Sequence, residues 1–264
     1  FTVNGVLKAQ GSVGDSIIFD NYNNYHFPQC FETACYDAMT LNLPWSDYPT
    51  TTNSCSSVSS WNDCSVCEDE GACDILGVVE KWYGIYLEEV TSETILEYVR
   101  VSGAGAEGKH GISILNSDPI LNHVEINNNG HWWNSYGGGI SVVSSNPIIS
   151  NANIHSNQGY QGGGIYIENG TGPITLVNSI IDNNYTNRAG GGLYMIQSDI
   201  IMNNVVISNN ELASNSGTGG GAFLSYGNYA VSPNSTGSYL NNIMIKDNFA
   251  KYEGGGLYLV SIDP

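Results

Sequence analysis

The sequence predicts an all-β solenoid in which coils of three short strands stack on one another. Three observations predict this fold class. A glycine triplet recurs five times in the second half of the 264-residue chain, at steps of 25, 28, 29 and 35 residues. A short strand with alternating apolar residues follows each triplet, and the phrase Asn-x-x-Ile-x-x-Asn, or a variant of it, precedes each one. Repeats with a period of roughly 20–50 residues are typical of solenoids.

Three segments follow one another along the chain. Residues 1–19 are interpreted as an opening coil, because apolar residues alternate through Val3 and Val6 and a short apolar run ends at Phe19. Residues 20–81 interrupt the repeat and are interpreted as a lateral insertion or a small cap. Residues 82–264 carry the coils. Since the chain ends just after a repeat begins, and an uncovered solenoid end exposes strand edges, we expect further coils or another domain beyond Pro264.

All six cysteines lie within the inserted segment. An even number of cysteines clustered in one irregular segment predicts disulfide staples, and therefore an oxidising compartment. The spacing does not choose among the possible pairings. The alternative is a zinc site built on the Cys-x-x-Cys pair. The residues concerned are Cys30, Cys35, Cys55, Cys64, Cys67 and Cys73.

The coil segment predicts where strands and corners fall. The period-two pattern after the glycines indicates strands with one buried face. Prolines such as Pro119, Pro147 and Pro173 are expected to open the next strand, a position where no ladder hydrogen bond is lost. The asparagines suit corners, because asparagine tolerates the left-handed conformation and stacked amides can hydrogen-bond to each other. The glycine triplets supply positive φ and close backbone approach. Seven glycine-following strands are predicted, and they begin at Ile85, Ile112, Ile140, Ile165, Leu193, Ala222 and Leu257.

These repeats resemble those of the right-handed parallel β-helix superfamily, which includes pectate lyases and related polysaccharide-active enzymes. The phrases Gly-Gly-Gly-Ile/Leu and Ile-x-x-Asn are also similar to the repeats of polymorphic outer-membrane autotransporter adhesins, although isoleucine stands here where those adhesins have phenylalanine. Residues 1–19 resemble the opening coil of extracellular bacterial β-helix repeat proteins. The resemblance covers most of residues 82–260 and implies right-handed coils.

The outward-facing residues of the glycine-following strands predict a binding surface. Side chains alternate across a strand, so the residue between two buried apolar ones faces outward. Aromatic side chains in such positions bind sugar rings or anchor protein partners. The alternative is that neighbouring tyrosines stabilise adjacent strands. The predicted column consists of Tyr86, Ser113, Ser141, Tyr166, Tyr194, Phe223 and Tyr258.

A loop beside this column adds Trp132, Trp133 and Tyr136 to the candidate ligand-binding residues. Exposed aromatic residues on a loop suggest a binding role, and the alternative is that they fold back onto the solenoid. If the column is a binding surface, alanine at both Tyr166 and Tyr194 is expected to weaken glycan retention and to leave the melting curve nearly intact.

Charge excludes two classes of partner. The chain has 25 acidic and 7 basic residues and a formal net charge of -18. Nucleic-acid phosphates require lysine and arginine, so a nucleic-acid partner is not expected. An anionic membrane surface is disfavoured for the same reason, and no run of about 18 apolar residues predicts a membrane span. The balance suits a secreted or cell-surface protein.

The resemblance to β-helix lyases implies a lysine or arginine base that acts on an acidic sugar, often with calcium. The only matching set near one face is Lys109, His110 and Arg188. Lys109 and Arg188 are expected three coils apart, about 14 Å at the strand spacing, which is long for one catalytic centre. Calcium is the candidate cation, and the alternative is a solvated acidic loop. The candidate calcium ligands are Glu68, Asp69, Glu70 and Asp74.

The leading hypothesis is therefore an extracellular or cell-surface β-helix module that binds a glycan or a protein through an aromatic face. One alternative is a secreted polysaccharide lyase or epimerase that acts on an acidic polysaccharide. The other is a structural stalk or filament subunit.

Overall fold

The computed structural model describes residues 2–3, 6–19, 82–214, 217–226 and 238–261. Residues 20–81 lie outside the described residues, and with them the six cysteines and the acidic candidates Glu68, Asp69, Glu70 and Asp74. The disulfide, zinc and calcium hypotheses therefore stay predictions. One compact unit contains residues 1–21 and 81–264.

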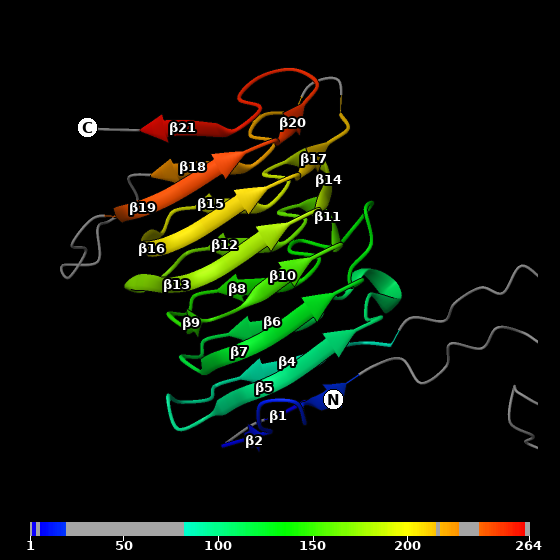
Figure 1. Cartoon of the computed structure of the whole chain (residues 1–264), viewed down its shortest axis with the longest axis vertical. Coiled ribbons are helices and arrows are strands. Elements are labelled where there is room, and N and C mark those ends of the chain that lie inside the picture. Colours follow the sequence, from blue (N-terminus) through cyan, green and yellow to red (C-terminus); the bar gives the residue numbers. More distant parts are fainter. Residues whose placement is uncertain (1, 4–5, 20–81, 215–216, 227–237, 262–264) are drawn as a thin grey trace, which may run out of the picture. The chain divides into compact units, whose positions relative to one another are not determined.

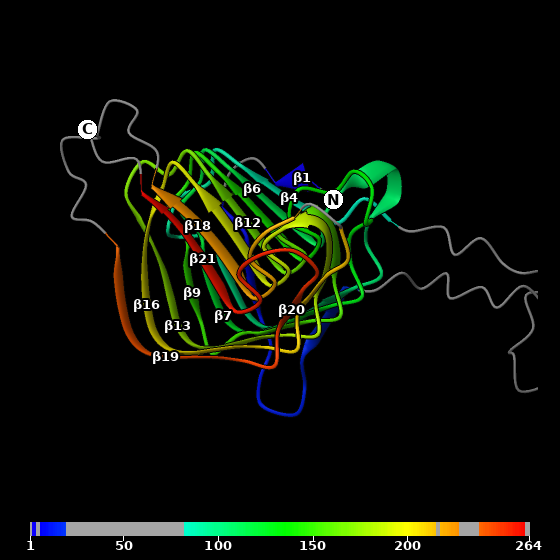
Figure 2. The ribbon, with the colours of Figure 1, turned by 90° about the horizontal axis from the view of Figure 1, so that it is seen from above.

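The described strands form three parallel sheets that run along the solenoid (Figure 1). Viewed along the stack, each coil closes around a central core (Figure 2). Every pairing between the named strands is parallel, and residues of like position in successive coils are partners. This register confirms the stacked β-solenoid, with sheet partners such as Tyr166 and Tyr194 or Ile181 and Ile207.

The glycine-following strands form the first sheet. We call it the slot sheet, after the pocket on its outer face. All seven predicted strands are present, and β1 pairs with the first of them. Along β4, β6, β8, β12, β15 and β18, apolar residues alternate into the core, as the sequence predicted. The strands are β1 (Thr2–Val3), β4 (Ile85–Glu88), β6 (Ile112–Leu115), β8 (Ile140–Val143), β12 (Ile165–Glu168), β15 (Leu193–Ile196), β18 (Ala222–Tyr226) and β21 (Leu257–Ser261).

The second sheet, called the long sheet, contains most of the longest strands. The sequence predicted two short strands separated by a corner at the first asparagine of each phrase. In most coils the structure instead has one bent strand that continues through this residue, for example β13 through Asn178 at φ 49°. The strands are β2 (Lys8–Gln10), β3 (Ile17–Phe19), β5 (Ile95–Ser102), β7 (Ile120–Asn127), β9 (Ile148–Ser150), β10 (Asn153–His155), β13 (Pro173–Asp182), β16 (Asp199–Ser208) and β19 (Tyr239–Lys246).

The third, small sheet corrects a further expectation. The segments between the last asparagine and the glycines were expected to be loops, but four of them contain short strands that pair with one another. These are β11 (Gln158–Gln161), β14 (Tyr185–Ala189), β17 (Glu211–Leu212) and β20 (Phe249–Ala250). In an earlier coil a single-turn helix, η3 (Ala106–Gly108), occupies the equivalent stretch.

The last asparagine of each phrase forms a buried ladder. The Nδ2 of Asn157 donates to Asn184 Oδ1 at 3.0 Å and to the carbonyl of Ile126 at 2.9 Å. The Oδ1 of Asn157 accepts from the backbone N–H of Asn129 at 3.0 Å. Each amide therefore satisfies backbone groups of the corner that no strand pairing reaches, and the stacking of amides is confirmed.

The glycine triplets allow the corner before the slot sheet to be tight. The first glycine has positive φ in every triplet, for example 64° at Gly162. The second lies so near the next coil that a Cβ on Gly163 would be 2.4 Å from the carbonyl oxygen of Tyr185. Both predicted roles of the triplet are confirmed. No helix among the described residues is long and apolar enough to cross a membrane.

Candidate functional site

The outward column of the slot sheet has the register that the sequence predicted. Tyr86 pairs with Ser113, Ser113 with Ser141, and Ser141 with Tyr166. The column then continues through Tyr194, Phe223 and Tyr258. Like positions on neighbouring strands therefore form one column, in which two serines separate Tyr86 from the other aromatic residues.

The aromatic part of the column is less accessible than expected. The ring centroids of Tyr166 and Tyr194 are 5.3 Å apart with an interplanar angle of 2°, and Tyr194 and Phe223 are 4.9 Å apart at 7°. Phe223 and Tyr258 continue the stack at 5.6 Å. Because each ring covers its neighbour, Tyr166 is only 6% and Tyr194 only 7% exposed. The expectation of an open aromatic face is therefore wrong for these two residues, and strand-to-strand stacking accounts for them.

The two serines interrupt this stack and leave a slot in the outer face. Two small side chains stand where two rings would otherwise lie, so Tyr86 and Tyr166 face a gap three strand spacings wide, about 14 Å between backbones. The slot has a volume of 290 Å³. Its lining consists of Tyr86, His110, Ser113, Ile114, Leu115, Tyr136, Ser141, Val143, Tyr166 and Glu168.

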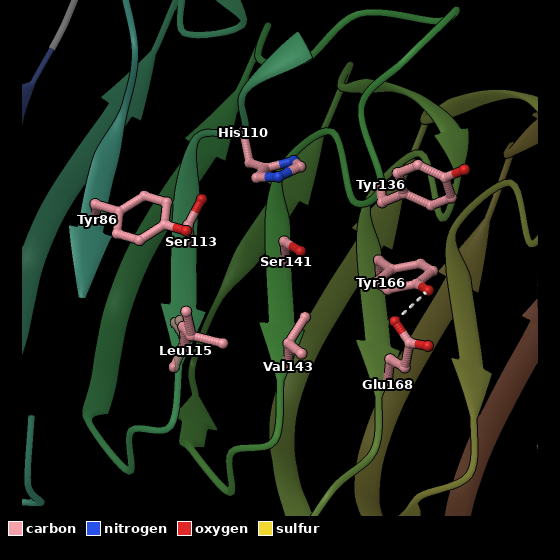
Figure 3. Close-up of a pocket in the computed structure, with 10 residues that line it drawn as sticks. Tyr86, His110, Ser113, Leu115, Tyr136, Ser141, Val143, Tyr166 and Glu168 are labelled. Carbon is pink, nitrogen blue, oxygen red and sulfur yellow. Dashed lines mark hydrogen bonds between the residues drawn. The ribbon is translucent and has the colours of Figure 1, made fainter. Parts of the chain in front are cut away.

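Figure 3 shows how the lining residues are arranged. Tyr86 lies on one side of the slot, and Tyr136 and Tyr166 lie on the other. Ser113 and Ser141 lie between them on the strands that form the floor. His110 stands at one end, and Leu115, Val143 and Glu168 stand at the opposite end.

The rings of Tyr136 and Tyr166 form a braced wall. Their centroids are 5.4 Å apart at 70°, an edge-to-face contact, and Tyr136 makes a similar contact with Tyr160 at 5.6 Å. Such geometries are favourable for aromatic pairs. Tyr194 supports Tyr166 from behind, so this wall is held in place before any ligand arrives.

His110 presents a hydrogen-bond acceptor to the slot. Its Nδ1 lies 3.0 Å from the carbonyl oxygen of Gly137. A carbonyl oxygen only accepts, so Nδ1 carries the proton and Nε2 keeps its lone pair. Burial lowers the pKa of His110 to about 4, with the charge of Lys109 as a smaller cause, although the hydrogen bond to Gly137 acts in the opposite direction. At neutral pH the imidazole is therefore uncharged.

Glu168 supplies the carboxylate at the other end. The hydroxyl of Tyr166 donates to its Oε2 at 2.8 Å. Burial, and then this carboxylate, raise the pKa of the Tyr166 phenol, so the phenol stays protonated and keeps donating. The hydrogen bond fixes the direction of Glu168 and leaves its other oxygen for a ligand.

Ser113 contributes an unsatisfied group to the floor. Its Oγ is buried and has no hydrogen-bond partner among the described residues. Buried polar atoms in folded proteins nearly always have a partner, so an orphan of this kind needs an explanation. Because this oxygen has almost no exposed surface, a ligand in the slot would reach it only after a local movement of the surrounding side chains.

The loop with the tryptophans borders the His110 end of the slot. Ser135 Oγ donates to the carbonyl of Lys109 at 3.1 Å, which ties the loop to the segment before β6. Trp132 and Trp133 stack on each other with centroids 4.7 Å apart and are 41% and 62% exposed. They do not line the slot, but they form an exposed aromatic pair beyond its rim.

The three candidate catalytic residues do not form one centre. His110 lines the slot, whereas Arg188 lies three coils further along the solenoid. Arg188 Nη1 donates to the hydroxyl of Tyr160 at 2.6 Å, and its guanidinium lies 5.5 Å from the centre of that ring. Lys109 neighbours His110 in the chain but is not among the lining residues. Within the described part of the chain, no group of three or more histidine, cysteine or acidic residues could hold a metal.

Four lining residues were not predicted from the sequence as part of the site, and one of them, Ile114, is a core residue. Leu115, Val143 and Glu168 follow the second buried apolar residue of their strands, one position beyond the pattern used to define the column. Extending that pattern by one residue would have found them. It would not have shown that the serines open a slot, because that depends on the directions of the rings on either side.

A family comparison agrees with this architecture. A family model described as the right handed beta helix region matches residues 62–236, well over half of the chain. The chain therefore belongs to the right-handed β-helix family. No significant match was found among curated proteins or among solved structures, and the resemblance to autotransporter adhesins stays a prediction.

Proposed function

We propose that this right-handed β-helix protein is an extracellular module that binds glycans in the slot between Tyr86 and Tyr166. The observation that carries the proposal is the interruption of the aromatic stack by Ser113 and Ser141. A ring-shaped ligand that enters the gap would contact Tyr86 and Tyr136, the wall rings that keep exposed area, since Tyr166 behind Tyr136 is only 6% exposed. Stacking of this kind is a common way to bind the apolar face of a sugar ring.

The chemistry of the lining supports a polar ring rather than an aromatic one. The walls are aromatic, whereas the floor and both ends present hydroxyl, imidazole and carboxylate groups. Typical ligand pockets combine apolar walls with a few polar groups that fix orientation, and their volumes begin near 300 Å³. At 290 Å³ the slot suits one or two sugar rings.

The arrangement favours binding over lyase chemistry. Removal of a proton next to a sugar carboxylate needs a base together with a cation on that carboxylate. In the slot, the base candidate His110 has no cationic side chain beside it among the lining residues, and Arg188 lies three coils away. The acidic character of the chain and the predicted disulfides support placing this module outside the cell.

The proposal is tested by a substitution that places a new side chain inside the slot. In Ser141→Phe, a new ring would stack against Tyr166 and extend the aromatic column. The fold is therefore expected to survive, while the new ring fills the slot. Wild type and variant would be screened on an array of neutral, amino and acidic glycans, and hits would be titrated calorimetrically. We expect at least a tenfold loss of affinity in Ser141→Phe.

The matched control places the same ring elsewhere on the outer surface. Thr175 lies on β13 in the long sheet, and its side chain does not line the slot. Thr175→Phe should bind as wild type does. Tyr86→Ala, which removes the opposite wall, gives a second test should Ser141→Phe fail to fold. Absence of any glycan binding by wild type, or equal binding by both slot variants, would overturn the proposal.

A further inference from the structure

The slot also carries information about which sugar it takes. Building on the proposed function, we infer that it accepts an uncharged sugar at the end of a glycan chain, and that it rejects uronic acids and internal residues of a chain. Two independent features lead to this: the charges that line the slot and the side chains that stand on all its sides.

The charges exclude an acidic sugar. Glu168 is the one carboxylate among the lining residues, and no lysine or arginine lines the slot to offset it. His110 donates from Nδ1 to Gly137, so its free ring nitrogen accepts hydrogen bonds and offers no positive charge. A uronate would lose part of its hydration inside the slot and meet a like charge, with no cation to compensate.

The polar groups instead match sugar hydroxyls. The free oxygen of Glu168 and Nε2 of His110 are acceptors for two hydroxyl hydrogens at opposite ends of the slot. Hydroxyl groups both donate and accept, so a neutral pyranose satisfies both positions without a net charge.

The side chains around the slot favour a terminal residue. Tyr86 and Tyr166 flank the slot along the solenoid, and His110 and Glu168 stand at its ends along the strand direction (Figure 3). An internal residue must leave by two linkages on roughly opposite sides of its ring. Because side chains flank the slot on all four sides, a terminal residue with one linkage should fit it more readily than an internal residue with two.

The charge argument is tested by changing one atom type. Glu168→Gln keeps an oxygen that can accept from Tyr166 and removes the charge. Wild type and variant would be titrated with matched trisaccharides that end in a hexose or in the corresponding uronic acid. Wild type should favour the neutral end, and Glu168→Gln should raise affinity for the uronate-ended sugar about tenfold. Equal or tighter binding of the uronate by wild type would overturn the charge argument.

The preference for a terminal sugar is tested with cyclic glycans, which have no terminal residue. A linear glucan and its cyclic counterpart of the same linkage, for the linkage that the array favours, would be compared by calorimetry. The linear form should bind and the cyclic form should bind at least tenfold more weakly. Equal affinities, with both still abolished by Ser141→Phe, would refute the terminal preference and leave glycan binding standing. If no glycan binds wild type at all, the proposed function itself fails.

Discussion

Replacement of Tyr194 by alanine tests whether the stacked rings of the aromatic column stabilise the fold. Tyr194 stacks on Tyr166 and on Phe223 with centroid distances of 5.3 and 4.9 Å, and only 7% of it is exposed. Each aromatic pair contributes about 0.5–1.5 kcal/mol beyond area burial. Truncation of a fully buried large aromatic residue costs about 3–5 kcal/mol. Since this ring lies on the outer face, where water can fill part of the space, we expect a loss of about 2–4 kcal/mol.

This loss should appear as a lower melting temperature. For a folded unit of this size, 1 kcal/mol corresponds to roughly 2–4 °C, so the midpoint should fall by roughly 5–15 °C. Thermal and urea unfolding followed by far-ultraviolet circular dichroism would measure it. This expectation replaces the one drawn from the sequence, which assumed open rings and an almost unchanged melting curve.

The matched control is Tyr194→Phe, which keeps both stacking contacts and removes only the hydroxyl. It should lose only about 0.5–1.5 kcal/mol, the usual contribution of the one hydrogen bond that the hydroxyl makes with Gln161. If Tyr194→Ala were as stable as Tyr194→Phe, the stacked rings would contribute nothing to the fold, and the reasoning from ring geometry would be refuted.

Three further predictions concern the scaffold and the slot. Asn157→Ala should cost about 2–5 kcal/mol in urea unfolding, because Asn129 N–H and Ile126 C=O lose buried partners, whereas exposed Asn153→Ala on β10 should change little. Gly163→Ala should lower the melting temperature, because its Cβ would lie 2.4 and 2.5 Å from backbone oxygens. Gly172→Ala is the control and should leave the melting temperature unchanged, because the atom nearest to its Cβ is 3.5 Å away. Equal effects of the two substitutions would contradict the argument from close backbone approach. The pKa of His110 is lowered to about 4 in the folded protein, against about 6.5 in the unfolded chain. Between these pH values the unfolded state binds more protons than the folded state. The free energy of unfolding should therefore fall as the pH drops through this window, by up to ~1.4 kcal/mol per pH unit. His110→Gln should lose less stability than wild type between pH 7 and pH 4.5 in urea titrations, and parallel losses would show that another group is responsible.

The repeats made the scaffold predictable because each repeated residue has one local role. Gly162 was expected to adopt positive φ and does, and Asn157 was expected to join an amide stack and does. The bent long strands were less predictable. Asn178 adopts the left-handed conformation of a corner, as expected, yet the pairing of β13 with β16 continues on both sides of it. Local propensity identifies a bend but does not tell whether strand pairing survives it.

The repeats were enough to predict the stacking of coils, the order of residues in the outward column and the place of the two serines within it. These follow from periodicity, because equal positions in equal repeats must become neighbours. The folded chain was needed to show that the rings lie face to face, that Tyr166 and Tyr194 are thereby buried, and that His110, Ser113 and Glu168 line one pocket. The direction of a side chain depends on the packing around it, and a neighbour from another coil supplies that packing, so no stretch of sequence contains this information locally.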